Sequence, residues 1–167
     1  ASLARHGTAA ARVHIVAGDL TRPGLLDGPR HEVLPSRIDH VFHLAAVYDM
    51  GMTEEEASRI NLDGTREVVA FVNALGSDVR FHHVSSIAVS GDRFEGTFLE
   101  SDFDVGQPLE HPYYRSKFES ERIVREECRV PWRIYRPGIV VGHSGSGAIA
   151  KADGPYYFFD KVRVVSA

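Results

Sequence analysis

Four short apolar runs, each ending in small or polar residues, constrain the fold of this chain more than any other feature. They are Arg12–Ala17, Asp39–Ala46, Val79–Val84 and Pro131–Tyr135, and most are rich in β-branched or aromatic residues. Long stretches of helical character separate the second run from the third and the third from the fourth. Short buried strands that alternate with helices are typical of right-handed βαβ units. The sequence therefore predicts an α/β fold with a parallel sheet.

Two helices are predicted between these strands. The first begins at Thr53, an N-cap followed by three glutamates, and ends at Gly76. Asn61 and Gly64 lower its helix propensity, which we interpret as close packing or a polar contact at that point. The second helix opens at Pro112, a residue favoured at the first helical position, and continues through Glu127 without a breaker.

The ends of the predicted strands carry the candidate chemistry. The four runs are followed or closed by Gly18-Asp19-Leu20, Ala45-Ala46, Ser85-Ser86 and Pro137-Gly138. Ligands of open α/β sheets bind at the carboxyl ends of the strands, which meet at one edge. We therefore expect these residues to converge on a single binding site.

Tyr113 and Lys117 add a proton-transfer device. They lie four residues apart, so on a helix both point from the same face. A positive charge beside a phenol favours the phenolate and lowers the pKa of tyrosine from its ordinary value of about 10. This spacing suits a general acid. Taken alone, it also fits an ordinary amphipathic helix with a surface lysine.

Composition excludes several classes of function. The chain has 167 residues, a mass of 18.5 kDa and a net charge of −4, which is typical of one globular domain and argues against binding to nucleic acid or anionic membranes. Cys128 is the single cysteine, so no internal disulfide or cysteine-rich zinc site is expected, and a cytoplasmic location is favoured. The histidines show no metal-ligand spacing, and no apolar run has the length of a transmembrane segment.

Six motifs, in order and with the expected spacing, resemble the extended short-chain dehydrogenases/reductases. These motifs are Gly18-Asp19-Leu20, His43-Leu-Ala-Ala46, Asn61-Leu-Asp-Gly64-Thr65, Val84-Ser85-Ser86, Pro112-Tyr113-x-x-Ser116-Lys117 with Glu121, and Arg136-Pro137-Gly138. Within that family, Val41–Met50, Phe81–Ile87, Val124–Cys128 and Gly154–Phe159 are similar to the amino-terminal reductase domain of bacterial alcohol-forming fatty acyl-CoA reductases. The resemblance implies a Rossmann-type doubly wound parallel sheet.

The resemblance also implies roles for individual residues. Tyr113 would be the catalytic acid, Lys117 would lower its pKa and bind the nicotinamide ribose, and Ser86, rather than Ser85, would hold the substrate oxygen. Asn61 would have a more structural role. The remaining cofactor-binding residues would be Asp19 and Leu20 at the adenine, Ala45 and Ala46, whose small side chains would let the protein backbone approach the cofactor, and Pro137 and Gly138 at the nicotinamide.

The activity implied is NADPH-dependent reduction of a long-chain fatty acyl-CoA or fatty aldehyde toward the alcohol. NADH remains open as the cofactor, and a homo-oligomer is possible. The same triad also serves nucleotide-sugar epimerases, dehydratases and hydroxysteroid-type dehydrogenases. A different class, a non-catalytic nucleotide-binding module, would keep the fold but would not need the acid at Tyr113.

The family pattern has parts that these residues do not contain. The family begins with a strand and a glycine-rich turn that binds the pyrophosphate, and it ends with a substrate-binding part. Neither is found within residues 1–167, so we expect the chain to be an excerpt, a partial NAD(P)-binding Rossmann domain, from a longer polypeptide.

Overall fold

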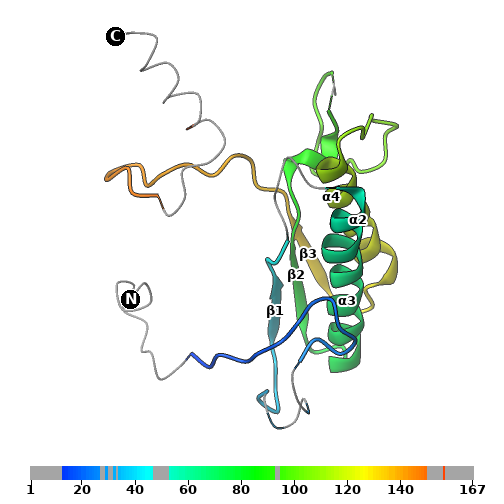
Figure 1. Ribbon diagram of the computed structural model, residues 1–167, viewed down its shortest axis with the longest axis vertical. Coiled ribbons are helices and arrows are strands. Elements are labelled where there is room, and N and C mark those ends of the chain that lie inside the picture. The colour runs from blue at the N-terminus through cyan, green and yellow to red at the C-terminus, as the bar shows by residue number, and fades with distance from the viewer. Residues whose placement is uncertain are drawn as a thin grey trace.

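A parallel β-sheet covered on one face by helices forms the centre of the structure (Figure 1). The computed structural model describes residues 13–26, 34–46, 53–92 and 95–149, together with residues 29, 32 and 156. Its strands are β1 (His40–His43), β2 (Arg80–Val84) and β3 (Trp132–Tyr135), in the order β1-β2-β3. Both neighbouring pairs are parallel, with Val41 opposite Phe81 and Phe81 opposite Trp132. The prediction of a parallel α/β sheet is confirmed.

The two crossovers each carry a helix. The first comprises α2 (Glu54–Glu56), the π-helix η3 (Ala57–Asp63) and α3 (Gly64–Leu75), and the second holds the 3₁₀ helix η4 (Ile87–Ser90) and α4 (Pro112–Glu127). Figure 1 shows α3 and α4 on the same side of the sheet. Successive right-handed crossovers in one direction place their helices on a common face. No helix in the described part of the chain is both long enough and apolar enough to cross a membrane.

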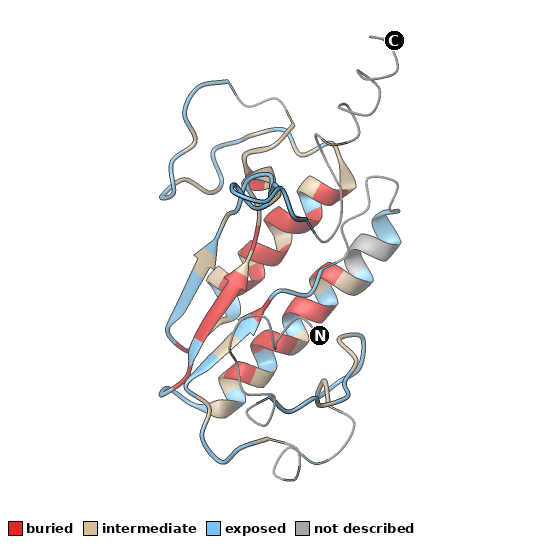
Figure 2. Cartoon of the chain, turned by 90° about the vertical axis from the view of Figure 1, so that its left-hand side faces the viewer, coloured by how far each residue is buried: buried red, intermediate tan, exposed pale blue. Residues whose placement is uncertain are grey.

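The hydrophobic core lies between the sheet and these two helices. Valines at a helical spacing on α3, Val68, Val69 and Val72, pack against Phe81 of β2, which is fully buried. The other buried members of the cluster are Val79, Ile123, Val124 and Val130. Figure 2 shows this buried layer along β2 and the inner faces of the helices. Burial of each large side chain contributes roughly 1.5–3 kcal/mol, so this layer fixes the helices on the sheet.

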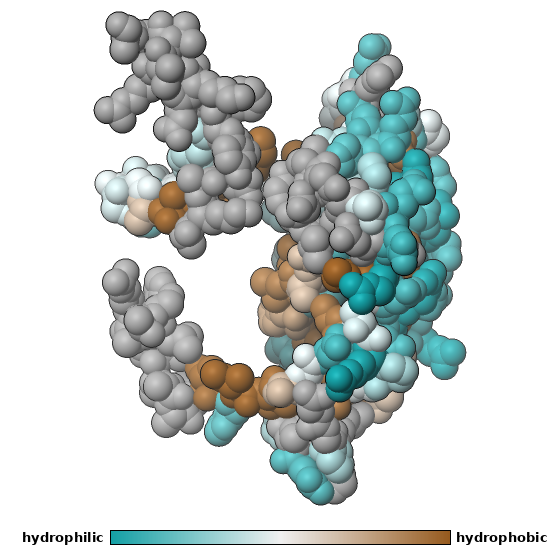
Figure 3. Space-filling view, in the orientation of Figure 1, coloured by the Kyte–Doolittle hydropathy of each residue, from teal (hydrophilic) through white to brown (hydrophobic). Residues whose placement is uncertain are grey.

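The opposite face of the sheet has no helix over it among the described residues. His82 is stacked between Phe42 and Tyr135, with ring centroids 4.2 Å and 5.8 Å apart. Its two ring nitrogens bond Nδ1 of His40 and the hydroxyl of Tyr135, each at 2.9 Å. Phe42 is 57% exposed, and Figure 3 shows apolar surface on this side of the sheet.

The strand predicted over Arg12–Ala17 is wrong for the residues that the structure describes there. Residues 13–17 form no strand, and Ile15 is 96% exposed. Gly18 makes one isolated antiparallel bridge, to Leu26. In the doubly wound strand order 3-2-1-4-5-6, the run at residues 12–17 would be the third strand and β1 the fourth. Two other strands, the first and the second, lie between these positions. No described residues form those two strands, so this apolar run has no backbone ladder to join.

Candidate active site at the carboxyl ends of the strands

Ser86 stands at the end of β2, where the chain turns into η4. Its backbone is extended, and its Oγ accepts a hydrogen bond of 3.1 Å from the amide of Ala88, so Ser86 caps the short helix. The Ile87 amide donates to the carbonyl of Pro137 at 3.2 Å. The structure thereby brings two predicted site residues, Ser86 and Pro137, to the same edge of the sheet.

Tyr113 begins α4 in a fixed position. His111 is the N-cap, and its Nδ1 accepts from the Tyr113 amide at 3.1 Å. The Asp92 carboxylate in turn accepts from the His111 amide at 3.2 Å. Tyr113 is 8% exposed and packs against Ala88 of η4. The helix that Ser86 caps therefore contacts the tyrosine directly.

A close backbone crossing holds these elements together. The Asp92 amide donates to the carbonyl of Pro108 at 3.1 Å, which closes the loop between η4 and α4. Gly91 has a φ of +87°, and a Cβ on it would lie 2.4 Å from that same carbonyl oxygen. Only glycine tolerates both the positive φ and the close approach. This crossing fixes the start of α4 against η4.

Lys117 lies one turn beyond Tyr113, in the interior. Its side chain is 7% exposed, and its Nζ donates to the carbonyl of Val84 at 3.4 Å. Burial lowers the pKa of Lys117 to about 8, so the amine remains largely charged at neutral pH. An ammonium has three donors, and this long hydrogen bond occupies one of them. Donors are thus left for a ligand at the strand ends.

Two buried histidines lie close to Lys117. His43 closes β1 and shares a hydrogen bond of 3.1 Å with the Thr65 hydroxyl, and its ring centroid is 5.4 Å from that of His83. Burial, with a smaller contribution from the Lys117 charge, lowers the pKa of His43 to about 4. Burial, followed by the charges of His43 and Lys117, lowers the pKa of His83 to about 3. Both rings are neutral at pH 7, so the lysine is the charged member of this cluster.

Asn61 connects the first crossover to α4. The π-helix η3 contains it, and its Nδ2 donates to Ser116 Oγ at 3.0 Å, while Ser116 Oγ donates to the Tyr113 carbonyl at 2.9 Å. Gly64 packs closely, because a Cβ there would lie 3.3 Å from Cβ of Leu20. The interpretation of Asn61 and Gly64 as a polar contact and a close-packing site is confirmed.

Asp19 and Leu20 lie in a turn that is attached to the start of α3. The Asp19 carboxylate accepts from the amide and hydroxyl of Thr21, at 2.8 Å and 2.7 Å. These bonds, the amide first, lower the pKa of Asp19. Leu20 packs against Gly64 and the core. The Asp19 side chain thus caps its own turn, and Leu20 anchors that turn on α3.

The remaining predicted residues lie at exposed strand ends. Ala45 and Ala46 follow β1, and Pro137 and Gly138 follow β3, all exposed. A Cβ on Gly138 would meet only Ile87 Cδ1, at 3.8 Å, so this structure sets no steric demand for glycine there. Small side chains leave the backbone open to a ligand at this edge. In the described residues, no group of three or more His, Cys, Asp or Glu side chains could hold a metal ion.

The sequence matches a family of NAD-binding domains. Residues 2–164 match the profile of the NAD_binding_4 family, described as male sterility protein. Glycine betaine reductase ATRR of Emericella nidulans is 32% identical over 143 residues, which is 82% of this chain and 11% of that protein. The chain therefore spans about a tenth of this curated relative.

Solved structures with the same fold include two reductase domains. The thiolation-reductase di-domain of an archaeal non-ribosomal peptide synthetase superposes with a TM-score of 0.74 at 21% identity, covering 94% of this chain and 43% of that one, a likeness of fold. The terminal R domain of the myxalamid PKS-NRPS pathway gives a TM-score of 0.71 at 29% identity, covering 86% and 38%. Reductase-type Rossmann domains are thus similar to this chain in sequence and in fold.

The residues present fit a dinucleotide. Small residues leave the backbone exposed at the ends of β1 and β3, and the buried Lys117 keeps donors at the same edge. NAD(P) is the cofactor that this family binds. The match over nearly the whole chain, the parallel sheet and the reductase domains that share its fold lead to one conclusion: this chain belongs to the NAD_binding_4, or male sterility protein, family and has its Rossmann-type NAD(P)-binding fold.

Proposed function

We propose that this protein uses NADPH to reduce the carbonyl group of an acyl thioester or aldehyde, with a long-chain fatty acyl-CoA or fatty aldehyde as its substrate. The observation that carries the proposal is the arrangement at one strand edge of Ser86, which caps η4, Tyr113, which packs on that helix, and the buried Lys117. A hydroxyl and a phenol beside an ammonium can polarise a carbonyl group and protonate its oxygen as hydride arrives.

The three residues divide the work between them. Tyr113 donates its phenolic proton to the carbonyl oxygen as negative charge develops there. Ser86 donates a hydrogen bond to the same oxygen and orients the carbonyl carbon. The positive charge of Lys117 stabilises the phenolate that Tyr113 leaves, because burial reduces the screening of that charge. Reduction of an aldehyde then yields the alcohol, and reduction of a thioester yields a hemithioacetal that releases the thiol and the aldehyde.

The cofactor would be held by residues from all of the strand ends. NADPH, when bound, supplies the hydride. Asp19 and Leu20 would meet the adenine end, Ala45 and Ala46 would allow the cofactor to approach the backbone, and Lys117 would bind the ribose hydroxyls. Pro137 and Gly138 would border the nicotinamide, next to the Ser86 segment to which Pro137 is hydrogen-bonded.

Apolar residues beside this edge support an acyl substrate over a sugar. Ile139, Val140 and Val141 follow Gly138 directly and are 68%, 75% and 60% exposed, and Ile87, next to Ser86, is 53% exposed. A sugar nucleotide would need hydrogen-bonding side chains at these positions, whereas a fatty acyl chain is stabilised by apolar contacts.

The test follows NADPH oxidation by absorbance in the purified protein. A long-chain acyl-CoA, a fatty aldehyde and a UDP-sugar are offered in parallel, and NADH replaces NADPH in a second series. We expect turnover with the acyl-CoA or the aldehyde and none with the UDP-sugar. An epimerase or dehydratase returns its hydride within each cycle and oxidises no NADPH overall, so the UDP-sugar is also followed by chromatography of the sugar nucleotide. Conversion of the UDP-sugar alone would favour a nucleotide-sugar enzyme, and NADPH binding without conversion of any substrate would favour a non-catalytic nucleotide-binding module; either result would refute the proposal.

A further inference from the structure

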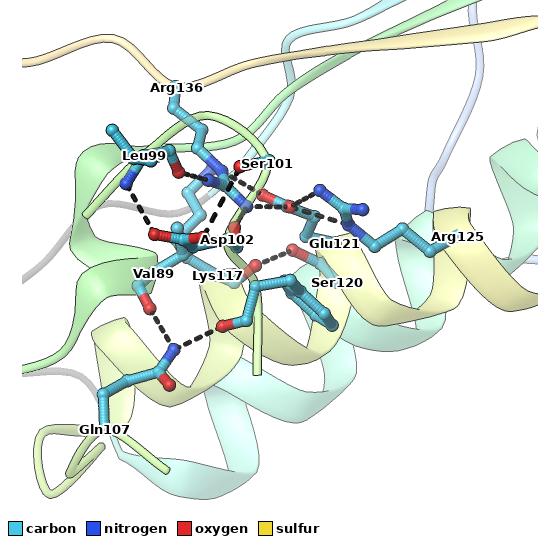
Figure 4. A network of polar contacts seen from close by, with 11 residues as sticks. Val89, Leu99, Ser101, Asp102, Gln107, Lys117, Ser120, Glu121, Arg125 and Arg136 are labelled. Carbon is cyan, nitrogen blue, oxygen red and sulfur yellow. Dashed lines mark hydrogen bonds and ion pairs between the residues drawn. The ribbon is translucent and has the colours of Figure 1, made fainter. Parts of the chain in front are cut away.

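A buried carboxylate lies on α4, one turn beyond the proposed catalytic residues. Glu121 follows Lys117 by four residues, so Tyr113, Lys117 and Glu121 share the buried face of the helix. The Glu121 side chain is 0% exposed. Its Oε1 accepts from Arg125 at 2.8 Å and from Arg136 at 2.7 Å, and its Oε2 accepts from Arg136 Nε at 3.1 Å (Figure 4).

Arg136 joins three parts of the fold. It follows the last residue of β3 and precedes Pro137 and Gly138. While it binds Glu121 with two nitrogens, it also donates to the carbonyl of Asp102 at 2.8 Å and to that of Leu99 at 3.4 Å. One guanidinium therefore connects α4, the end of β3 and the segment of residues 95–109, here called the 95–109 loop (Figure 4).

The 95–109 loop is held by its own contacts as well. Gln107 Nε2 donates to the carbonyls of Val89 and Phe103, both at 2.7 Å. The Phe103 ring stacks on Phe118 of α4, with centroids 4.4 Å apart. These contacts hold the loop against η4 and α4, and Arg136 adds hydrogen bonds to the loop carbonyls of Leu99 and Asp102.

Glu121 stays ionised in this setting. Burial alone would raise its pKa, but the hydrogen bonds from Arg136 and Arg125, together with the Arg136 charge, outweigh burial and lower it. A buried, fully hydrogen-bonded ion pair resists displacement, because removal of one partner leaves the other charge desolvated and unpaired. The bidentate geometry also fixes direction, since a planar guanidinium donates two parallel hydrogen bonds to a carboxylate in one orientation.

We propose that Glu121 and Arg136 are a positioning pair, which sets α4 along the end of β3 and thereby places Tyr113 and Lys117 relative to Pro137 and Gly138. The inference rests on the proposed function. The pair bridges the helix that would donate the proton and the strand end that would border the cofactor. The bond from Lys117 to the Val84 carbonyl is 3.4 Å long and holds α4 less firmly. A misplacement of about 1 Å lowers catalysis roughly 100-fold.

The test compares Glu121→Gln with Glu119→Gln. Glutamine keeps the size of Glu121 but loses the charge that holds two guanidiniums, whereas Glu119 makes only a part-exposed pair of 3.3 Å with Arg122 on the same helix. For Glu121→Gln we expect kcat to fall roughly 10- to 100-fold, while the Kd for NADPH stays within about threefold. Glu119→Gln should match the wild type in both quantities.

A double variant separates positioning from stability. Glu121→Leu with Arg136→Met removes both charges and replaces the ion pair with apolar side chains. Its midpoint of thermal unfolding should therefore lie closer to the wild-type value than that of Glu121→Gln. We expect kcat to stay low, because the directional contact is gone. Recovery of kcat together with stability, or an unchanged kcat in a folded Glu121→Gln protein, would overturn the inference. If the wild type reduces no substrate, the proposed function fails and this inference fails with it.

Discussion

Acid should unfold this protein through the two imidazoles beside Lys117. His43 and His83 are 6% and 2% exposed, and burial keeps both neutral in the folded chain. Neither ring nitrogen of His83 has a hydrogen-bond partner among the described residues, so no contact would stabilise its protonated form. The unfolded chain, in contrast, protonates both rings near pH 6.5.

The size of the effect follows from these pKa values. Because both folded values lie below 6.5, the contribution to stability is complete above pH 6.5 and is lost as the pH falls toward about 4 for His43 and about 3 for His83. Each histidine lowers the free energy of unfolding by about 1.4 kcal/mol per pH unit within its range. The full losses are about 3 and about 5 kcal/mol, and they overlap because the His43 charge contributes to the His83 value. A total of that size is comparable with the entire stability of a domain, about 5–15 kcal/mol.

Urea denaturation at half-unit steps from pH 7.5 to 4.5 measures this slope. We expect His83→Phe to remove about half of the slope below pH 6.5 and to raise stability at pH 7 by about 1–3 kcal/mol, because it removes an unpartnered polar ring from the core. The control His14→Gln changes an exposed histidine, which water solvates in both states, and should leave the slope unchanged. A flat profile in the wild type, or the wild-type slope in His83→Phe, would refute the reasoning.

Three further expectations concern the start of α4 and its loop. Gly91→Ala should destabilise by about 2 kcal/mol or more in thermal unfolding, because its Cβ would lie 2.4 Å from the Pro108 carbonyl oxygen. Gly106→Ala, at a φ of +79° with no atom within 4 Å of the new Cβ, should lower the free energy of unfolding by only about 1 kcal/mol. An equal loss of stability at both sites would contradict the close approach of Gly91 to the Pro108 carbonyl. His111→Ala should lose the N-cap and about 1 kcal/mol, which His111→Asp should restore; if aspartate fails to do so, the role of His111 is not capping.

The sheet and its helices could be predicted because local patterns determine them. The apolar runs at 39–46, 79–84 and 131–135 contain β1, β2 and β3, and Pro112 and Gly76 mark helix limits as expected. The run at 12–17 has the same local character, but a strand needs a neighbour, and none is formed by the described residues. A strand is therefore a property of the sheet and not of its own sequence alone.

The residues of the candidate site could be predicted from the sequence, whereas the buried contacts between them could not. Spacing predicted that Tyr113 and Lys117 share a face, and both lie on the buried face of α4. The burial of His83 next to His43, and the contact between Asn61 and Ser116, depend on pairings through space that no local pattern contains. The bond between Glu121 and Arg136, 15 residues apart, is of the same kind. Both residues belong to motifs that resemble the short-chain dehydrogenases/reductases, but the resemblance implies no role for either.

The central claim is that Tyr113 is the acid of a carbonyl reductase, and one pair of variants tests it most directly. Tyr113→Phe and Tyr114→Phe each remove one phenol hydroxyl, from adjacent residues of α4, so Tyr114→Phe is a matched control for Tyr113→Phe. With a fatty aldehyde and NADPH, we expect Tyr113→Phe to abolish turnover while its NADPH affinity stays within about threefold of the wild type, and Tyr114→Phe to keep both. Turnover that survives in Tyr113→Phe, or turnover and NADPH binding that are lost together, would contradict the account.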